Sequence, residues 1–420
     1  MASADAEETL TGQGPSAGGC AHPVQLVGRT DTVDLLTGEL VGSFGSDDVP
    51  GGRLLVACGD RRAVRCPTCS AVYRRDTYQL VRAGLAGGKG VPDTVAGHPC
   101  LFVTLTPPSF GAVHTQRVRP GGNQLRCRPR RAGGACEHGR LLACSTVHPA
   151  GDPVLGQPTC PDCYDYPGAV LWQAYAGRLW DRFTLGTRRH VATAAGVGVR
   201  GLAKHARVSF VRVAEFQRRG LIHLHAVIRL DGPDGPSDPP PPWGSAELLE
   251  HAVRAAHAAV LVRTPYTAAI GERELTWGRH LDIRPITTAG SDGDSSDRAR
   301  IASYIAKYVT KSAEDAGIRA TRMHSLADLD HTKMSPHARR IALTCWQLGG
   351  LPEYRHLRLR AWAHVLGYRG HASSKSRRYS ITLTQLRSAR AEHQSPHRPG
   401  TVHEGQWRYA GRGYPPASRP

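Results

Sequence analysis

Hydrophobic periodicity divides the central part of the chain into strand-like and helical segments. Residues 101–106 are a run of β-favouring residues that ends at two prolines, which is typical of a buried strand. Residues 169–183 place large apolar side chains at helical spacing. Residues 207–213 alternate with a period of two, and residues 221–230 form a second strand-like run. Between them, residues 217–220 end in glycine, so we predict a tight β-hairpin.

The segments after the hairpin predict a loop, three helical stretches and one more strand. Residues 231–244 are too rich in proline to pair in a sheet and indicate a linker or an exposed insertion. Residues 246–262 predict an Ala-rich amphipathic helix, and residues 281–286 a short strand. A further helix is expected from near residue 298 to about 316, and residues 335–368 are predicted to be largely helical. Strands and helices of this kind indicate an α+β fold.

Composition adds a strongly basic charge to this picture. The chain has 420 residues, with 54 Lys and Arg against 35 Asp and Glu and a formal net charge of +19. That balance favours a polyanionic partner. No run of about 18 apolar residues occurs, and the acidic N-terminus lacks the apolar segment of a secretory signal, so we expect no membrane span and a cytoplasmic location. In a reducing compartment, the 11 cysteines should be thiols or metal ligands.

The predicted hairpin brings together three side chains that bind divalent metals. With residues 218–220 as the loop, Gln217 pairs with Leu221, so Glu215 lies opposite His223 and Val213 opposite His225. Alternation then places the carboxylate and both imidazoles on one face of the sheet. Two imidazoles and one carboxylate make a metal site with open coordination positions. The alternative is a pair of solvent-facing histidines that bind nothing, and the opposed carboxylate favours the metal site.

The predicted helix from residue 298 carries two tyrosines and two lysines at helical spacing. Tyr304 and Tyr308 are four residues apart, and Lys307 and Lys311 follow the same spacing on an adjacent stripe. A phenol, with a pKa of about 10, is a poor nucleophile at neutral pH. It can attack a phosphodiester when a metal polarises the phosphate and cations stabilise the developing charge. The alternative is that the tyrosines belong to a core stripe of the helix.

Three motifs in this order resemble those of a known superfamily. The segment His223-Leu224-His225 is similar to the His-hydrophobic-His motif of the HUH endonucleases. Residues 102–106 resemble the strand motif that precedes it in rolling-circle replication initiators, and residues 304–311 resemble their tyrosine motif in its two-tyrosine form. The surrounding residues 67–92 and 213–220 resemble Streptomyces-type plasmid replication initiators. The likeness extends over roughly residues 20 to 385.

The resemblance implies an enzyme that starts plasmid rolling-circle replication in the bacterial cytoplasm. Such an enzyme nicks and rejoins one DNA strand at the origin through a 5′-phosphotyrosine, with Mg²⁺ or Mn²⁺ as catalytic cofactor. Its partners would be origin DNA and the host helicase and polymerase. Other readings are a conjugative relaxase or transposase of the same superfamily, and a non-catalytic zinc-containing DNA-binding protein.

The resemblance also assigns roles to individual residues. It implies that His223 and His225 are metal ligands and that Glu215 is the third. Asp282, on another predicted strand, competes with Glu215 for that role. Tyr308 matches the nucleophile and Tyr304 the second tyrosine. Lys307 and Lys311 would neutralise charge on the reacting phosphate.

The cysteines predict structural zinc that is separate from the catalytic ion. Cys66–Cys69 and Cys160–Cys163 are two C-P-x-C knuckles, and four thiolates from two knuckles suit tetrahedral zinc. Together they would join two distant segments. Cys127, Cys136 and Cys144, with His138 and His148, offer ligands for a second ion. Cys58 could replace a member of either set, Cys20 stays ambiguous, and Cys100 and Cys345 lie in apolar runs typical of the core.

The expected organisation is an α+β protein with an HUH core of antiparallel sheet and flanking helices, plus a cysteine-rich zinc module. The expected regions are a disordered N-terminus (1–19), a zinc-stapled region containing the strand 101–106 (20–168), a nuclease core with the proline-rich insertion (169–316), a helical region (317–370) and a basic tail (371–420).

Overall fold

The structure is a computed structural model of the chain. The chain divides into two units. It describes residues 17–128, 134–286, 293–311, 322–331, 334–394 and 399–414. One unit comprises Met1–Leu80 with Ile381–Pro420, and the other comprises Val81–Ser380. The boundary therefore divides the expected region 20–168 and the expected tail 371–420. No helix in the described ranges is both long enough and apolar enough to cross a membrane.

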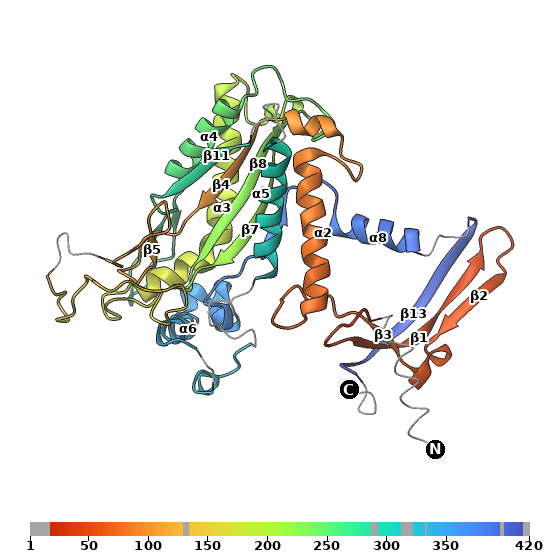
Figure 1. The fold of residues 1–420 in the computed structure, drawn as a ribbon, viewed down its shortest axis with the longest axis horizontal. Helices are drawn as coiled ribbons and strands as arrows, with labels where there is room; N and C mark the ends of the chain where they lie inside the picture. Colours follow the sequence, from red (N-terminus) through yellow and green to blue (C-terminus); the bar gives the residue numbers. More distant parts are fainter. Residues whose placement is uncertain are drawn as a thin grey trace. The chain divides into compact units, whose positions relative to one another are not determined.

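The larger unit is built on a five-stranded antiparallel sheet (Figure 1). Its strand order is β11-β4-β8-β7-β12. The strands are β4 (Cys100–Leu105), β7 (Arg207–Phe216), β8 (Ile222–Asp231), β11 (Leu281–Pro285) and β12 (Ser373–Lys375). Two short pairs accompany it, β5 (Arg117–Val118) with β6 (Gln124–Leu125) and β9 (Val262–Arg263) with β10 (Glu274–Leu275). The first four strands of the central sheet had all been predicted, because each is a run of β-favouring residues.

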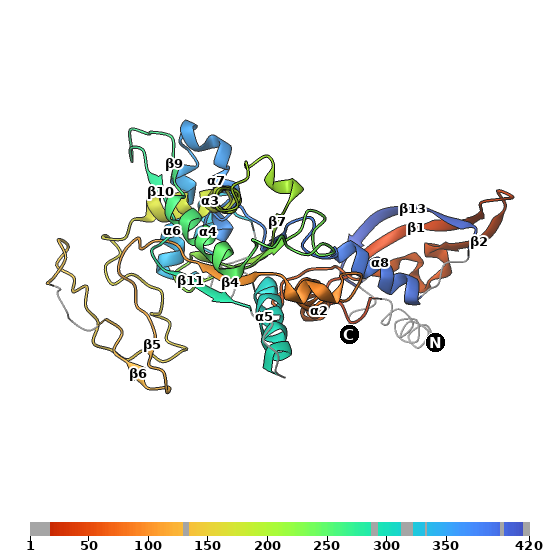
Figure 2. The ribbon, with the colours of Figure 1, turned by 90° about the horizontal axis from the view of Figure 1, so that it is seen from above.

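Helices cover both faces of this sheet, as Figure 2 shows: α3 and α4 lie on one side and α5 on the other. The helices of this unit are α3 (Tyr166–Ala194), α4 (Ala246–Ala259), α5 (Gly293–Thr310), α6 (Pro336–Leu348) and α7 (Leu359–Trp362). α3 extends 11 residues beyond the predicted segment 169–183. α4 is shorter than predicted, because Val260 is extended and the chain enters β9. α5 begins earlier than expected, and residues 312–316 lie outside the described residues.

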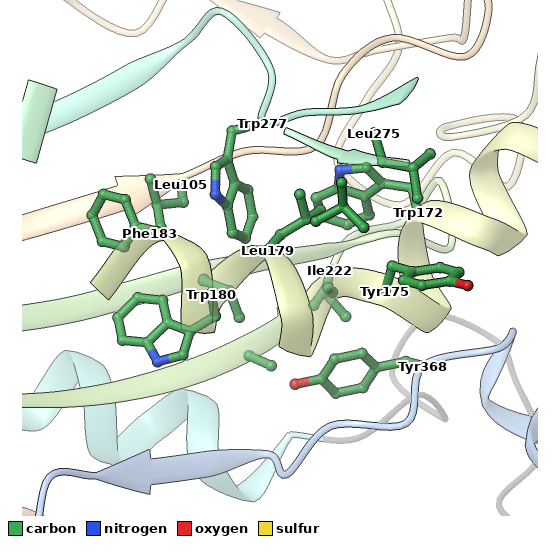
Figure 3. Packing of buried hydrophobic residues seen from close by; sticks show 14 of the residues in the cluster. Leu105, Trp172, Tyr175, Leu179, Trp180, Phe183, Ile222, Leu275, Trp277 and Tyr368 are labelled. Carbon is green, nitrogen blue, oxygen red and sulfur yellow. The ribbon is translucent and has the colours of Figure 1, made fainter. Parts of the chain in front are cut away.

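The hydrophobic core lies between the sheet and α3 (Figure 3). Trp172, Leu179 and Phe183 of α3 are fully buried, as are Leu105 of β4 and Ile222 of β8. Along β4 the core-facing residues alternate with residues 102 and 104, which point to the opposite face. That opposite face is the one covered by α5. The burial of one face therefore fixes which side chains are presented to the helix that carries the tyrosines.

The smaller unit contains a four-stranded antiparallel sheet that joins the two ends of the chain. Its strands are β1 (Val24–Asp34), β2 (Leu40–Gly45), β3 (Leu54–Val56) and β13 (Thr401–Arg412), with α8 (Leu383–Gln394) nearby in sequence; α2 (Pro67–Ala86) begins in this unit. β13 pairs with the whole length of β1. Gly28 is required there, because a Cβ atom would lie 1.9 Å from the Gln406 carbonyl oxygen. The basic C-terminal segment is thus folded over its described residues, which its composition did not predict.

Candidate functional site

The β7–β8 hairpin has the register that the sequence predicts. Glu215 pairs with His223, and Val213 pairs with His225. The backbone N–H of Gln217 donates to the Leu221 carbonyl at 2.8 Å and closes the turn. The hairpin therefore places one carboxylate and two imidazoles on the sheet face opposite α3.

His225 is the central residue of this face, and its two ring nitrogens have different partners. The side chain is 6% exposed, so its polar atoms depend on protein partners. Its Nε2 lies 3.0 Å from Glu215 Oε2. Its Nδ1 lies 3.1 Å from Thr104 Oγ1 of the neighbouring strand β4. A hydrogen bond at Nδ1 fixes the ring and directs Nε2 toward the carboxylate, as is common for histidines that bind metals.

His223 stands apart from the His225–Glu215 pair. The two histidine ring centroids are 6.2 Å apart. The three side chains are not among the described groups whose ligand atoms all lie within 4.8 Å of one another, so at least one distance from His223 is longer. Burial, with the nearby positive charge of Arg219, lowers the pKa of His223 to about 3. The imidazole is therefore neutral at pH 7, which is the form that can bind a metal.

Both tyrosines of α5 contact His225. Tyr304 Oη lies 3.4 Å from His225 Nε2, and the Tyr308 ring stacks on the imidazole with centroids 5.5 Å apart. The two phenol rings are 4.5 Å apart. The buried stripe of α5 is formed instead by its small and aliphatic residues, including Ile305 and Val309. The tyrosines thus face the histidines and are not part of the core stripe.

Lys307 of α5 and Lys311, the residue directly after this helix, lie near Tyr308. Lys311 Nζ is 4.6 Å from the centroid of the Tyr308 ring and 3.6 Å from Glu215 Oε1. Lys307 Nζ is 5.8 Å from the same ring. Lys311 therefore connects the helix to the carboxylate of the hairpin, and positive charge surrounds the Tyr308 ring.

The competing carboxylate, Asp282, lies farther along the sheet. It pairs with Thr104 in the strand register, and Thr104 in turn pairs with His225, so a full strand separates Asp282 from the histidine. The Asp282 carboxylate forms an ion pair with Arg284 at 3.2 Å. Both side chains line a pocket of about 410 Å³ that also contains Tyr304. Of the two candidates, Glu215 is the carboxylate in contact with His225.

The cysteines form three clusters, and their pairing differs from the predicted one. The first cluster is Cys20, Cys58, Cys66 and Cys69; the second is His114, Cys127, Cys144 and His148; the third is Cys136, His138, Cys160 and Cys163. The prediction that the two C-P-x-C knuckles share one ion is therefore wrong. Each knuckle completes its cluster with two ligands from elsewhere in the same unit. Cys100 and Cys345 are buried in the core, as expected.

The spacing within each cluster fits zinc. Tetrahedral Zn–S bonds of about 2.3 Å imply sulfur atoms about 3.8 Å apart. The Sγ atoms of Cys58 and Cys69 are 3.7 Å apart, and those of Cys20 and Cys66 are 3.8 Å apart. In the second cluster, Cys144 Sγ lies 3.4 Å from His148 Nε2. The clusters are consistent with three zinc sites.

Comparisons with known proteins identify the family. The family model described as replication initiator protein, pSAM2 (RepSA) matches residues 7–419. A replication initiator protein of Streptomyces ambofaciens is 44% identical over 414 residues, which are 95% of this chain and 85% of the relative. The chain belongs to the RepSA family of replication initiators. No solved structure matches it.

Family membership confirms the expectation of a plasmid-type replication initiator.

Several residues of the sites have no clear signal in the sequence. Thr104 was part of a recognised strand motif, but its contact with His225 depends on the register between β4 and β8. His114 is 13 residues from Cys127 and belongs to no knuckle pattern. Cys20 was ambiguous in the sequence, and only its position in the folded chain assigns it to the first cluster.

Proposed function

We propose that the chain starts replication by nicking and rejoining one strand of origin DNA. In this proposal Tyr308 is the nucleophile. The observation that carries the proposal is the position of the Tyr308 ring, which stacks on His225 while Lys311 contacts both that ring and Glu215. These residues come from the β7–β8 hairpin and from the end of α5, which are distant in sequence. A phenol, two cations and a histidine–carboxylate pair in one place have the chemistry for phosphoryl transfer to tyrosine.

His225 and Glu215, with His223 as a third donor, would hold a divalent ion. Two imidazoles and a carboxylate suit Mn²⁺ or Mg²⁺ with open positions, and Thr104 orients the buried imidazole as expected for a ligand. When bound, such an ion supplies charge that polarises the scissile phosphate. Glu215 is preferred to Asp282 as the carboxylate donor because it already contacts His225.

The protein's own residues account for the transfer. The Tyr308 oxygen attacks the phosphorus atom, the bond from phosphorus to the 3′ oxygen breaks, and the phosphate stays on the tyrosine as a 5′ ester. The phenol loses its proton, and the departing 3′ oxygen gains one. Lys307 and Lys311, near the Tyr308 ring, stabilise the negative charge on the attacking and departing oxygens. The free 3′ hydroxyl would then prime a host polymerase after helicase unwinding.

Tyr304 is proposed as the second nucleophile, which closes the round. Its ring is 4.5 Å from that of Tyr308, so both phenols can reach one phosphate. A second cleavage at the regenerated origin is needed while the first phosphotyrosine persists. The 36% exposure of Tyr304 supports a role in chemistry more than one in packing.

The experiment compares two phenylalanine variants on supercoiled plasmid that carries the cognate origin, with Mg²⁺ or Mn²⁺. Tyr308→Phe should form no covalent DNA adduct and no nick. Tyr304→Phe, its matched control on the same helix, should nick normally. In a replication extract that supplies helicase and polymerase, it should release long multimeric single strands in place of monomer circles.

An adduct mapped to neither tyrosine would refute the helix assignment. Normal monomer circles from Tyr304→Phe would reject the second nucleophile alone. DNA binding without any nicking by the wild type would favour the non-catalytic DNA-binding alternative. A nick at a transfer origin or a transposon end, but not at a replication origin, would favour the relaxase or transposase alternative.

A further inference from the structure

The segment between β4 and α3 contains two metal-ligating clusters whose ligands alternate along the chain. We call residues 112–128 and 134–165 the two-cluster module. The ligands occur as four pairs along the chain. The first and third pairs belong to the second cluster, and the second and fourth pairs belong to the third cluster. Each ion would therefore close a loop that contains ligands of the other. Little regular structure is present, since β5 and β6 have two residues each, so these clusters replace a core in ordering the module.

The module is anchored at the turn of the β7–β8 hairpin. His148 of the second cluster contacts Asp152 Oδ2 at 2.7 Å through Nδ1, and the Asp152 carbonyl accepts a hydrogen bond from Arg218 of the turn. Gly156 has φ of +85°, and a Cβ atom there would lie 2.4 Å from the Arg218 carbonyl carbon. The module is thus fixed to the end of the hairpin nearest to Glu215 and His223.

The acids and the arginines of the module differ in whether they have partners of opposite charge. All four of its acids have basic neighbours: Asp152 contacts His148, Asp162 pairs with Arg340, and Asp165 pairs with Arg273. The fourth, Glu137, is exposed and lies 3.9 Å from His138. The acids therefore serve to fold and attach the module.

The arginines of the module have no such partners. Five of them are exposed, and none forms an ion pair with a residue in the described part of the chain; they are Arg117, Arg119, Arg126, Arg128 and Arg140. We call the first four the hairpin arginines, because they lie on or beside β5 and β6. Figure 2 shows this hairpin extending away from the five-stranded sheet. A set of exposed guanidinium groups on a short, metal-ordered hairpin can contact phosphates bidentately.

We propose that the two-cluster module binds the backbone of duplex DNA next to the nicking site through the hairpin arginines. This proposal rests on the proposed function only for the position of the nick. The partner is identified by its chemistry: a regularly charged polyphosphate complements a surface with four guanidinium groups, where every carboxylate of the described module has a basic neighbour. Such contacts position the DNA without reading its sequence.

The salt dependence of binding tests the proposal, because each neutralised phosphate releases counterions. For B-DNA the slope of log K against log salt changes by about 0.9 for each phosphate contact. The probe is a short labelled duplex of random sequence, measured by fluorescence anisotropy with the full chain and without divalent ions. Nicking cannot occur under these conditions, so the result does not depend on Tyr308. Replacing all four hairpin arginines by glutamine should make the slope shallower by about 3 to 4.

Two matched variants separate this effect from general charge loss. The four corresponding lysine substitutions keep the charge and should leave the slope within about 1 of the wild type. Glutamine at Arg178, Arg188, Arg189 and Arg200, which are exposed on α3 and the loop after it, removes equal charge elsewhere in the unit and should change the slope little.

A wild-type slope for the hairpin variant, or an equal loss in the α3 variant, would overturn the proposal. Arg126 and Arg128 flank Cys127, so zinc content is measured for each variant. If the fourfold variant loses metal, the Arg117→Gln, Arg119→Gln double variant decides the question, with an expected change of about 2.

Discussion

Thr104 offers a sharp test of how the site is built, because its hydroxyl is the partner of His225 Nδ1. The change is Thr104→Val, which keeps the shape of the side chain and removes the 3.1 Å hydrogen bond. The histidine side chain is only 6% exposed, so water cannot easily replace the lost partner. Leaving a buried polar atom unpaired costs about 1–3 kcal/mol. The ring would then be free to rotate or to exchange its tautomer, which weakens Nε2 as a ligand.

The expected effect is on the affinity for the divalent ion. Loss of a hydrogen bond that orients a metal-bound histidine typically lowers metal affinity by about 10- to 100-fold. That range corresponds to about 1.4–2.7 kcal/mol, which agrees with the cost of the unpaired nitrogen. The assay is the nicking rate as a function of Mn²⁺ concentration. Thr104→Val should shift the midpoint upward by about 10- to 100-fold, with a rate at saturating Mn²⁺ close to that of the wild type.

The matched control is Thr106→Val, at the residue directly after the same strand. Thr106 also donates a hydrogen bond, to the His280 carbonyl at 2.8 Å, but it does not contact His225. This variant should lose some stability and keep the wild-type metal midpoint. Thr104→Ser should restore most of the affinity, because it restores the hydroxyl. The reasoning is refuted if Thr104→Val leaves the midpoint unchanged, or if Thr106→Val shifts it equally.

Zinc content and acid stability provide two further predictions. Purified protein should hold three zinc ions, one for each cluster; Cys69→Ser should lose one, whereas Cys144→Ser should lose about two because the second and third clusters alternate in sequence. Elemental analysis measures this, and a loss of one ion in both variants would contradict the coupling. Burial lowers the pKa of His337 to about 4 from 6.5, so the unfolded chain binds the proton first as pH falls below about 6.5. The free energy of unfolding should decrease by about 2 kcal/mol between pH 7 and 5 on this account. Denaturant titrations of His337→Gln at several pH values should show a free energy of unfolding that depends less on pH than that of the wild type. An equal pH dependence in the two proteins would refute the assignment.

The locations of the three cysteine clusters indicate which parts of the fold bound zinc would stabilise. The second and third clusters lie in a segment whose described strands have two residues each, and the first cluster lies beside the small sheet formed by the two ends of the chain. In the first cluster, burial raises the pKa of Cys66, but backbone N–H groups of Cys69 and Ala21 outweigh it and lower the pKa to about 7. That thiol is therefore readily ionised, which favours metal binding near neutral pH.

Features that depend on neighbouring residues could be predicted from the amino-acid sequence. A glycine after Arg218-Arg219 and alternation on both sides specify the hairpin, so the pairing of Glu215 with His223 could be predicted correctly. Helical spacing likewise placed Tyr304 and Tyr308 on one face of one helix. These are short-range relations, in which the geometry of a turn or a helix fixes the distance between side chains.

Contacts between distant segments could be known from the folded chain alone. The sequence offered Glu215 and Asp282 as alternatives, and strand order separates them by placing β4 and β8 between β11, which carries Asp282, and β7, which carries Glu215. The two C-P-x-C knuckles, at Cys66 and Cys160, have the same motif, so the sequence does not indicate that they lie in different units and join different clusters. The basic C-terminal segment looked like a tail until β13 paired with β1. Such pairings depend on which surfaces remain available after the core has folded, and the local sequence pattern does not contain that information.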